Sequence, residues 1–236
     1  MEVFICESLI ILLIIGSLNW LPKKLYEKSD YYKQTRNSFH SMRFNKGIRG
    51  EFLIWKYLQK LSGYKKYLFN CYLPKKNAET TEIDVILLHE SGIYVFESKN
   101  YSGWIFGNEM QQYWTQCLPK GRGRSRKIRF FNPIIQNKVH LKWLGKYLNR
   151  DSNLFYSYIV FSDRCKLKNI TLTDNQHHVI NRYNILSAVN TNAKLYKVKM
   201  SHNEINELYD KLQPLTQVGE NIKSTHIDMI QKKLAK

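Results

Sequence analysis

The sequence predicts an α/β fold in which helices flank a mixed central sheet, preceded by one N-terminal transmembrane helix. An amphipathic helical pattern is followed by strand-like runs, a second helical pattern and a further apolar strand, and a dense apolar run opens the chain. The expected order is a transmembrane anchor at 1–21, a tether at 22–41, a main domain at 42–161 and a C-terminal extension of strands and helices at 162–236.

The composition is strongly basic, with 37 Lys and Arg residues against 19 Asp and Glu residues in 236, a net charge of +18. This surplus indicates a polyanionic partner, either nucleic acid or an anionic membrane face, and charge alone does not choose between them. Cys6, Cys71, Cys117 and Cys165 form no Cys-x-x-Cys pair, which favours free thiols in a reducing compartment. The sequence has no phosphate-binding loop and no nucleophile elbow, which argues against a nucleotide-driven motor or a serine hydrolase.

The N-terminal segment 3–21 is apolar enough for a membrane span, and Glu7 is its one charged residue. No Lys or Arg precedes it, whereas lysines follow it and Trp20 lies at the boundary. This asymmetry predicts an uncleaved anchor in the cell membrane, with the rest of the chain facing the cytoplasm. The alternative is a buried or interfacial hydrophobic helix.

The remaining elements follow from hydrophobic period and turn residues. The tether is polar and tyrosine-rich, could be helical, and carries no predicted chemistry. Helices are expected at 47–61, at 132–148 with Asn132 as cap and Pro133 in the first turn, at 203–212 and at 224–234. Strands are expected at 67–73, 82–88, 93–99, 104–106, 113–116, 154–161, 166–172 and 177–182, and 120–129 is expected as a basic loop.

The strands 82–88 and 93–99 carry the residues that point to chemistry. A tight turn at Glu90-Ser91 would pair Asp84 with Glu97 and Glu82 with Lys99, so two carboxylates and an ammonium would share one face. The neighbours are apolar: Ile83, Val85 and Leu87 are expected on one face, and Ile86 and Leu88 on the other with Asp84. Charges there need pairing or a metal ion; the alternative is a structural ion pair at an exposed end of the sheet.

Glu51 is the expected helical partner of this patch. Its spacing to Ile54 and Trp55 places it on the core side of its helix, and Gly47 and Gly50 would admit another backbone or a ligand. The alternative is a carboxylate that serves only the helix N-terminus.

These residues resemble the nuclease-related domain, NERD, over about 42–161. The motifs are Gly47-x-x-Gly50-Glu51, Glu82-Ile83-Asp84, Glu97-Ser98-Lys99-Asn100-Tyr101-x-Gly103, Trp114 and Asn132-Pro133-x-x-Gln136-Asn137. NERD is similar to the restriction-endonuclease-like superfamily, whose signature is an Asp followed by Glu-x-Lys. The resemblance implies a Mg²⁺-dependent nuclease, with Mn²⁺ as a substitute and DNA as the expected substrate. It implies catalytic roles for Glu51, Asp84, Glu97, Lys99 and Gln136, with Asp84, Glu97 and the Ser98 carbonyl on the metal. Gln136 could equally be a polar residue on the helix flank.

A stretch without acidic residues supplies the expected nucleic-acid surface: Lys120, Arg122, Arg124, Arg126, Lys127, Arg129, Lys138 and Lys142. Its competing use is contact with anionic lipid. Trp104, Tyr113 and Trp114 are expected in the core rather than stacked on bases. His140, His177 and His178 match no metal motif and are expected to be structural or on the surface. The competing functions are a non-catalytic nucleic-acid-binding or scaffold module at the membrane, and a lipid-surface adaptor.

Overall fold

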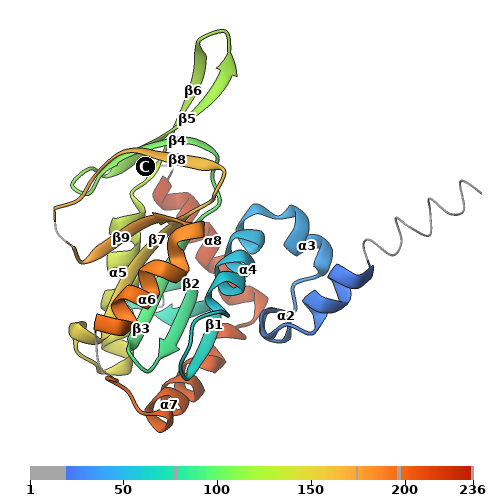
Figure 1. Cartoon of the computed structure of the whole chain (residues 1–236), viewed down its shortest axis with the longest axis vertical. Helices are drawn as coiled ribbons and strands as arrows, with labels where there is room; N and C mark the ends of the chain where they lie inside the picture. The colour runs from blue at the N-terminus through green and yellow to red at the C-terminus, as the bar shows by residue number, and fades with distance from the viewer. Residues whose placement is uncertain (1–19, 77–78, 174, 196–197, 235–236) are drawn as a thin grey trace, which may run out of the picture.

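The computed structural model of the chain describes residues 20–76, 79–173, 175–195 and 198–234 (Figure 1). The predicted anchor at 1–21 falls almost wholly outside these residues. Within them, no helix combines the length and the apolar character that a membrane crossing requires.

The segment predicted as a tether is helical and packs on the domain. Residues 20–27 are helical, and α2 (Asp30–Thr35) and α3 (Phe39–Phe44) follow, each capped by a serine side chain. Tyr26 and Tyr31 are buried against α4 (Lys46–Leu58). These two tyrosines therefore belong to the core of the α/β domain.

The central sheet is mixed, as predicted, with the strand order β1-β2-β3-β7-β9. The strands β1 (Lys65–Pro74), β2 (Thr80–His89) and β3 (Gly92–Lys99) are antiparallel, whereas β7 (Phe155–Phe161) and β9 (His177–Asn181) run parallel to β3. His89 pairs with Gly92, so the predicted turn and its register are confirmed.

Each face of this sheet is covered by its own helices. One core lies between the sheet and α4 with α6 (Ile185–Leu195), a helix that the sequence analysis missed. The other core lies under α5 (Pro133–Leu148) and α7 (His202–Leu212). Asn132 caps α5 and Pro133 opens it, as predicted. The central strands are therefore buried on both faces.

A second sheet has the order β6-β5-β4-β8. It consists of β4 (Gly103–Asn108), β5 (Tyr113–Gly121), β6 (Arg124–Phe131) and β8 (Cys165–Thr171). The prediction of a loop at Lys120–Arg129 is wrong, because β5 and β6 form a long hairpin through a turn in which Gly121, Arg122 and Gly123 have positive φ. This hairpin projects beyond the body of the molecule (Figure 1). Trp114 is buried as expected, but Trp104 is exposed.

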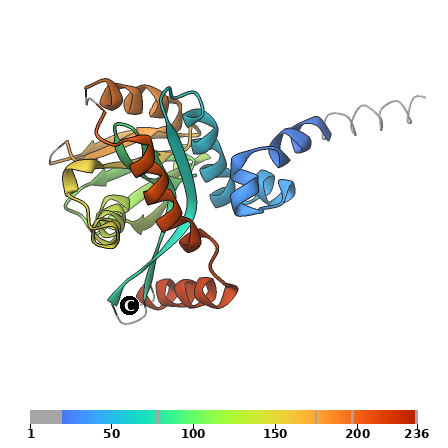
Figure 2. The ribbon, with the colours of Figure 1, turned by 90° about the horizontal axis from the view of Figure 1, so that it is seen from below.

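The helix α8 (Glu220–Leu234) lies beside the end of the β1–β2 hairpin where β1 finishes at Pro74 and β2 begins at Thr80 (Figure 2). Its His226 Nδ1 is 3.0 Å from Thr80 Oγ1, and the ring packs edge-on against Tyr72. Cys71, Cys117 and Cys165 are buried free thiols; Cys6 lies outside the described residues.

Candidate functional site

The site lies where β2 and β3 separate. Their ladder ends at the pair Val85–Phe96, so Asp84 and Glu97 are not paired strand positions, nor are Glu82 and Lys99. The Ser98 backbone N–H instead donates to Asp84 Oδ2 at 2.7 Å. Meanwhile β3 continues beside β7 as far as Lys99. Asp84 and the end of β3 at Glu97 and Ser98 therefore come together because the Asp84 side chain spans the gap between the two strands.

The regular alternation expected for β2 is also wrong at this point. Ile83 packs with Ile86 and Leu88 in the core under α5, whereas Val85 packs in the core under α4. In an unbroken strand Ile83 and Val85 would share one face. The alternation breaks at Asp84, which gives that carboxylate its place between the two layers.

Glu97 is almost fully buried, at 1% exposure, and both of its oxygens are held. Lys99 Nζ donates to Oε1 at 2.5 Å, and His140 Nε2 is 3.1 Å from Oε2. Burial raises the pKa of Glu97, but Lys99 and His140 outweigh burial and hold it below its usual value. Glu97 is therefore an ionised carboxylate inside the protein.

Lys99 also reaches α5, because its Nζ donates to Gln136 Oε1 at 3.1 Å. Burial lowers the pKa of this ammonium, and the negative charge of Glu97, with Tyr101 and Asp84, more than reverses that effect. Gln136 thus lies beside Lys99, where the resemblance implied a site residue. Lys99 is held as a cation.

His140 is a site residue that the sequence analysis missed. It is buried, and its Nδ1 is 2.8 Å from Thr81 Oγ1 while Nε2 faces Glu97. It follows Gln136 by four residues on α5, so both side chains lie on one helix face. That spacing was the available signal. By contrast, His177 contacts Ser157 Oγ at 2.7 Å and His178 stacks on Tyr158, structural contacts of the expected kind.

Asp84 is surrounded by other carboxylates. Burial raises its pKa well above the usual value, and the charges of Glu97 and Glu51 add to the rise. The Ser98 N–H and the Lys99 ammonium act in the opposite direction and do not compensate. The group thus favours either a proton or a cation beside it.

Glu51 approaches from the α4 side, buried at 9% exposure. Tyr31 donates its hydroxyl to Glu51 Oε2 at 3.0 Å. Burial raises the pKa of Glu51 to about 7, and the charges of Glu82 and Glu97 contribute. Tyr31 was another missed residue, because it lies in the segment predicted as a tether.

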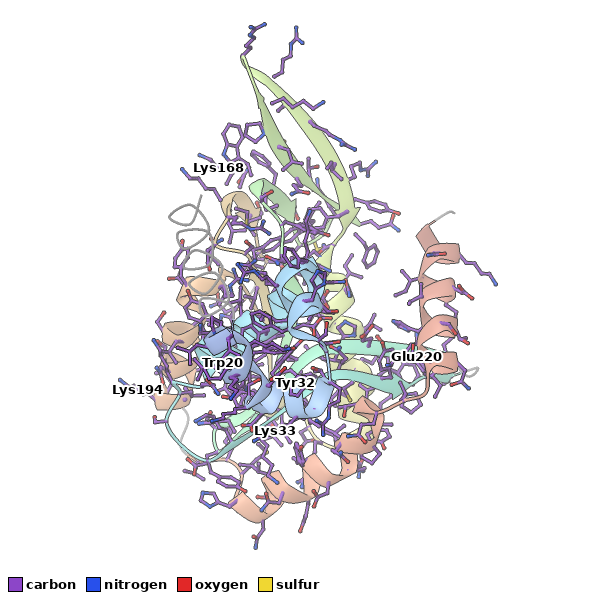
Figure 3. The ribbon with its side chains drawn as sticks, turned by 90° about the vertical axis from the view of Figure 1, so that its right-hand side faces the viewer. Trp20, Tyr32, Lys33, Lys168, Lys194 and Glu220 are labelled. Carbon is purple, nitrogen blue, oxygen red and sulfur yellow. The ribbon has the colours of Figure 1, made fainter. Side chains whose placement is uncertain are left out.

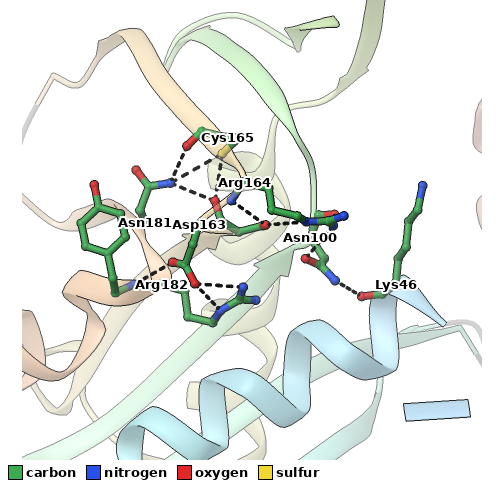
Figure 4. Close-up of polar contacts among 9 residues, drawn as sticks. Lys46, Asn100, Asp163, Arg164, Cys165, Asn181 and Arg182 are labelled. Carbon is green, nitrogen blue, oxygen red and sulfur yellow. Dashed lines mark hydrogen bonds and ion pairs between the residues drawn. The ribbon is translucent and has the colours of Figure 1, made fainter. Parts of the chain in front are cut away.

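The close approach of α4 to the end of β3 depends on Gly50. A Cβ at this position would lie 2.5 Å from Ser98 Oγ and 3.3 Å from the Asn100 Cβ. Asn100 Nδ2 donates to the Lys46 carbonyl at 2.6 Å, and Arg164 donates to the Asn100 carbonyl at 3.1 Å (Figure 4). Ser98 and Asn100, which follow Glu97, therefore make the close contact that the sequence predicted at Gly50.

The predicted nucleic-acid residues fall into two groups. One group lies exposed on the β5–β6 hairpin and forms no ion pair within the described part of the chain: Lys120, Arg122, Arg124, Arg126, Lys127 and Arg129. In Figure 3 this hairpin rises above the body, with Lys168 beside its base. The other group is on α5, where Lys138 pairs with Glu109 at 2.7 Å and exposed Lys142 lines a cavity further along the helix. Among the predicted nucleic-acid residues in the described part of the chain, those on the hairpin therefore form the larger group of exposed cations outside ion pairs.

A mixed sheet splits beside an Asp and a Glu-x-Lys, and a Glu from a flanking helix faces them, which is the arrangement expected of a restriction-endonuclease-like protein. Residues 46–162 match the family described as the nuclease-related domain, NERD, so this part of the chain is a NERD domain. The chain is 28% identical to an uncharacterized protein of Bacillus anthracis, over 237 residues that cover 100% of both chains. No solved structure matches the chain significantly.

Proposed function

We propose that this NERD domain is a metal-dependent nuclease that hydrolyses phosphodiester bonds, with DNA as the expected substrate. The observation that carries the proposal is the position of half-buried Lys99 between buried Glu97 and Gln136, with Asp84 at its side. Charged groups inside an apolar sheet destabilise the fold, so their grouping supports a role beyond packing of the core.

The donor chemistry at this site fits a hard divalent cation. Asp84, Glu97 and Glu51 offer carboxylate oxygens, which Mg²⁺ and Mn²⁺ prefer. Across the described residues, no set of three His, Cys, Asp or Glu side chains is already close enough to hold a metal ion. Each carboxylate oxygen keeps a second lone pair beyond its present hydrogen bond, so Glu97 remains a possible ligand. Asp84 and Glu97 would hold the cation, with the Ser98 carbonyl as a further oxygen and the rest of the shell from water.

The residues of the chain then divide the work of hydrolysis. The cation would neutralise phosphate charge and increase the acidity of an attacking water. Lys99 remains protonated, so it would orient the water and stabilise negative charge developing on the phosphodiester rather than accept a proton. His140 and Gln136 hold Glu97 and Lys99 in place, and Glu51 would contact the metal shell through water.

The test is a cleavage assay of the detergent-solubilised full chain on labelled duplex DNA, single-stranded DNA and RNA, with Mg²⁺, Mn²⁺ or EDTA. We expect turnover only with a divalent cation, and a loss of about 100-fold or more in Glu97→Gln and in Lys99→Ala. Lys194→Ala is the control, because Lys194 is exposed and remote in sequence from the site. Salt-sensitive binding without turnover would instead support a non-catalytic nucleic-acid-binding or scaffold module.

We further propose that residues 1–21 anchor the protein in the cell membrane, with the NERD domain facing the cytoplasm. The apolar segment and the lysines that follow it support this orientation. Membrane fractionation with a protease-protection assay tests it. Release of the protein by high salt would contradict an anchor.

A further inference from the structure

Asn70 has an unusual backbone for a residue in the middle of a strand. It lies in β1 with φ of 51°, in the left-handed region that non-glycine residues other than Asn and Asp rarely adopt. Phe69 pairs with Val85 and Cys71 with Ile83, so the register places Asn70 opposite Asp84, although the ladder omits this pair. Strained backbone of this kind concentrates at functional sites.

The strain at Asn70 coincides with a change of faces in β1. Phe69 packs in the core under α4, and Cys71 packs in the core under α5, although residues two apart normally share a face. The same change occurs in β2 at Asp84, between Ile83 and Val85. Asn70 and Asp84 thus form a matched irregularity directly at the site.

The side chain of Asn70 has an unused acceptor. Its Oδ1 is buried and has no hydrogen-bond partner within the described residues. The amide of Asn70 hydrogen-bonds to Glu51, where it opposes the rise in the pKa of that carboxyl. Buried polar atoms without a partner are rare in folded proteins, and an unseen water or ion is a common explanation. An amide oxygen is also a normal ligand of hard divalent cations.

We propose that Asn70 is a further cation-binding residue of this site, whose Oδ1 supplies a neutral oxygen ligand beside Asp84. This inference rests on the proposed metal-dependent function. It adds an oxygen donor from β1 to those of β2 and β3. It also assigns the strained backbone a purpose, since the left-handed conformation changes the face that the side chain occupies.

The experiment measures Mn²⁺ binding by isothermal titration calorimetry at pH 8, with the detergent-solubilised full chain and no nucleic acid. We expect Asn70→Gly to weaken Mn²⁺ binding about tenfold or more. Its metal-free melting temperature should stay close to that of the wild type, because glycine adopts positive φ without strain. Asn70→Asp, which keeps an oxygen at this position, should retain binding.

Asn149→Gly is the matched control, because Asn149 has φ of 53° at the exposed end of α5. It should leave Mn²⁺ affinity unchanged. Asn70 could affect Mn²⁺ binding as a ligand or only through its hydrogen bond to Glu51. To separate these two roles, Asn70→Gly is also made in the Glu51→Gln background. A ligand role predicts a further loss of Mn²⁺ affinity in the double variant. Wild-type affinity in Asn70→Gly, or no further loss in the double variant, would overturn this proposal and leave the proposed function intact. A wild-type protein that binds no Mn²⁺ would overturn both.

Discussion

Replacing Glu51 with Gln should stabilise the metal-free protein at pH 8 and change it little near pH 4. Burial, with the charges of Glu82 and Glu97, raises the pKa of Glu51 from 4.5 to about 7. The folded protein therefore binds this proton more tightly than the unfolded chain does. The proton on Glu51 stabilises the folded state fully below pH 4.5, and this stabilisation is lost as the pH rises from 4.5 through about 7. Above about pH 7, the native state carries a destabilising buried charge.

The pKa difference sets the size of the effect. A change from 4.5 to about 7 corresponds to roughly 3 kcal/mol at 1.36 kcal/mol per pKa unit. For a chain of this length, that is a rise of about 6–12 °C in the melting temperature of Glu51→Gln at pH 8. The glutamine keeps an oxygen that can accept the hydrogen bond from the Tyr31 hydroxyl.

The assay is thermal unfolding in EDTA from pH 4 to pH 8, followed by circular dichroism. Glu207→Gln is the matched control, because Glu207 is exposed on α7 and should give the same curve as the wild type. A stabilisation that does not change between pH 4 and pH 8 would refute the reasoning. So would a Glu51→Gln protein that is less stable than the wild type at pH 8.

Two further predictions concern the hairpin and Gly50. Replacing Arg122, Arg124 and Arg126 with Gln should weaken binding to duplex DNA. It should also reduce the slope of log affinity against log salt concentration by up to about 3, because each lost phosphate contact contributes roughly 0.9. If the slope of this triple variant equals that of the control Lys194→Ala, the DNA-binding surface lies elsewhere. Gly50→Ala should lose about 1–3 kcal/mol of stability in chemical denaturation, because its Cβ would lie 2.5 Å from Ser98 Oγ. Gly47→Ala, whose Cβ meets only Asn45 Oδ1 at 3.4 Å, should not lose stability, and equal losses in both variants would contradict this explanation.

The sequence predicted the parts of the fold that depend on local pattern. The turn at Glu90-Ser91 determined the register of β2 and β3, and the Asn132-Pro133 pair marked the start of α5. It did not predict β6, because the arginines and lysines of that strand are exposed and give no alternation of apolar and polar residues. The contact between His140 and Glu97 joins residues 43 positions apart. Tertiary packing alone brings such residues together.

The separation of β2 from β3 explains how side chains from both layers of helices reach one site. Glu97 contacts His140 on α5, on one side of the sheet, whereas Glu51 extends from α4 on the other side. A continuous sheet would lie between them. Because the ladder ends at Val85–Phe96 and the faces change at Asp84, the charges of Glu51 and Glu97 both act on Asp84 through this opening. The β2–β3 hairpin alone therefore cannot form the site. It requires α4 and α5 to be packed in place, so any change that loosens either helix should reduce metal binding before it unfolds the sheet.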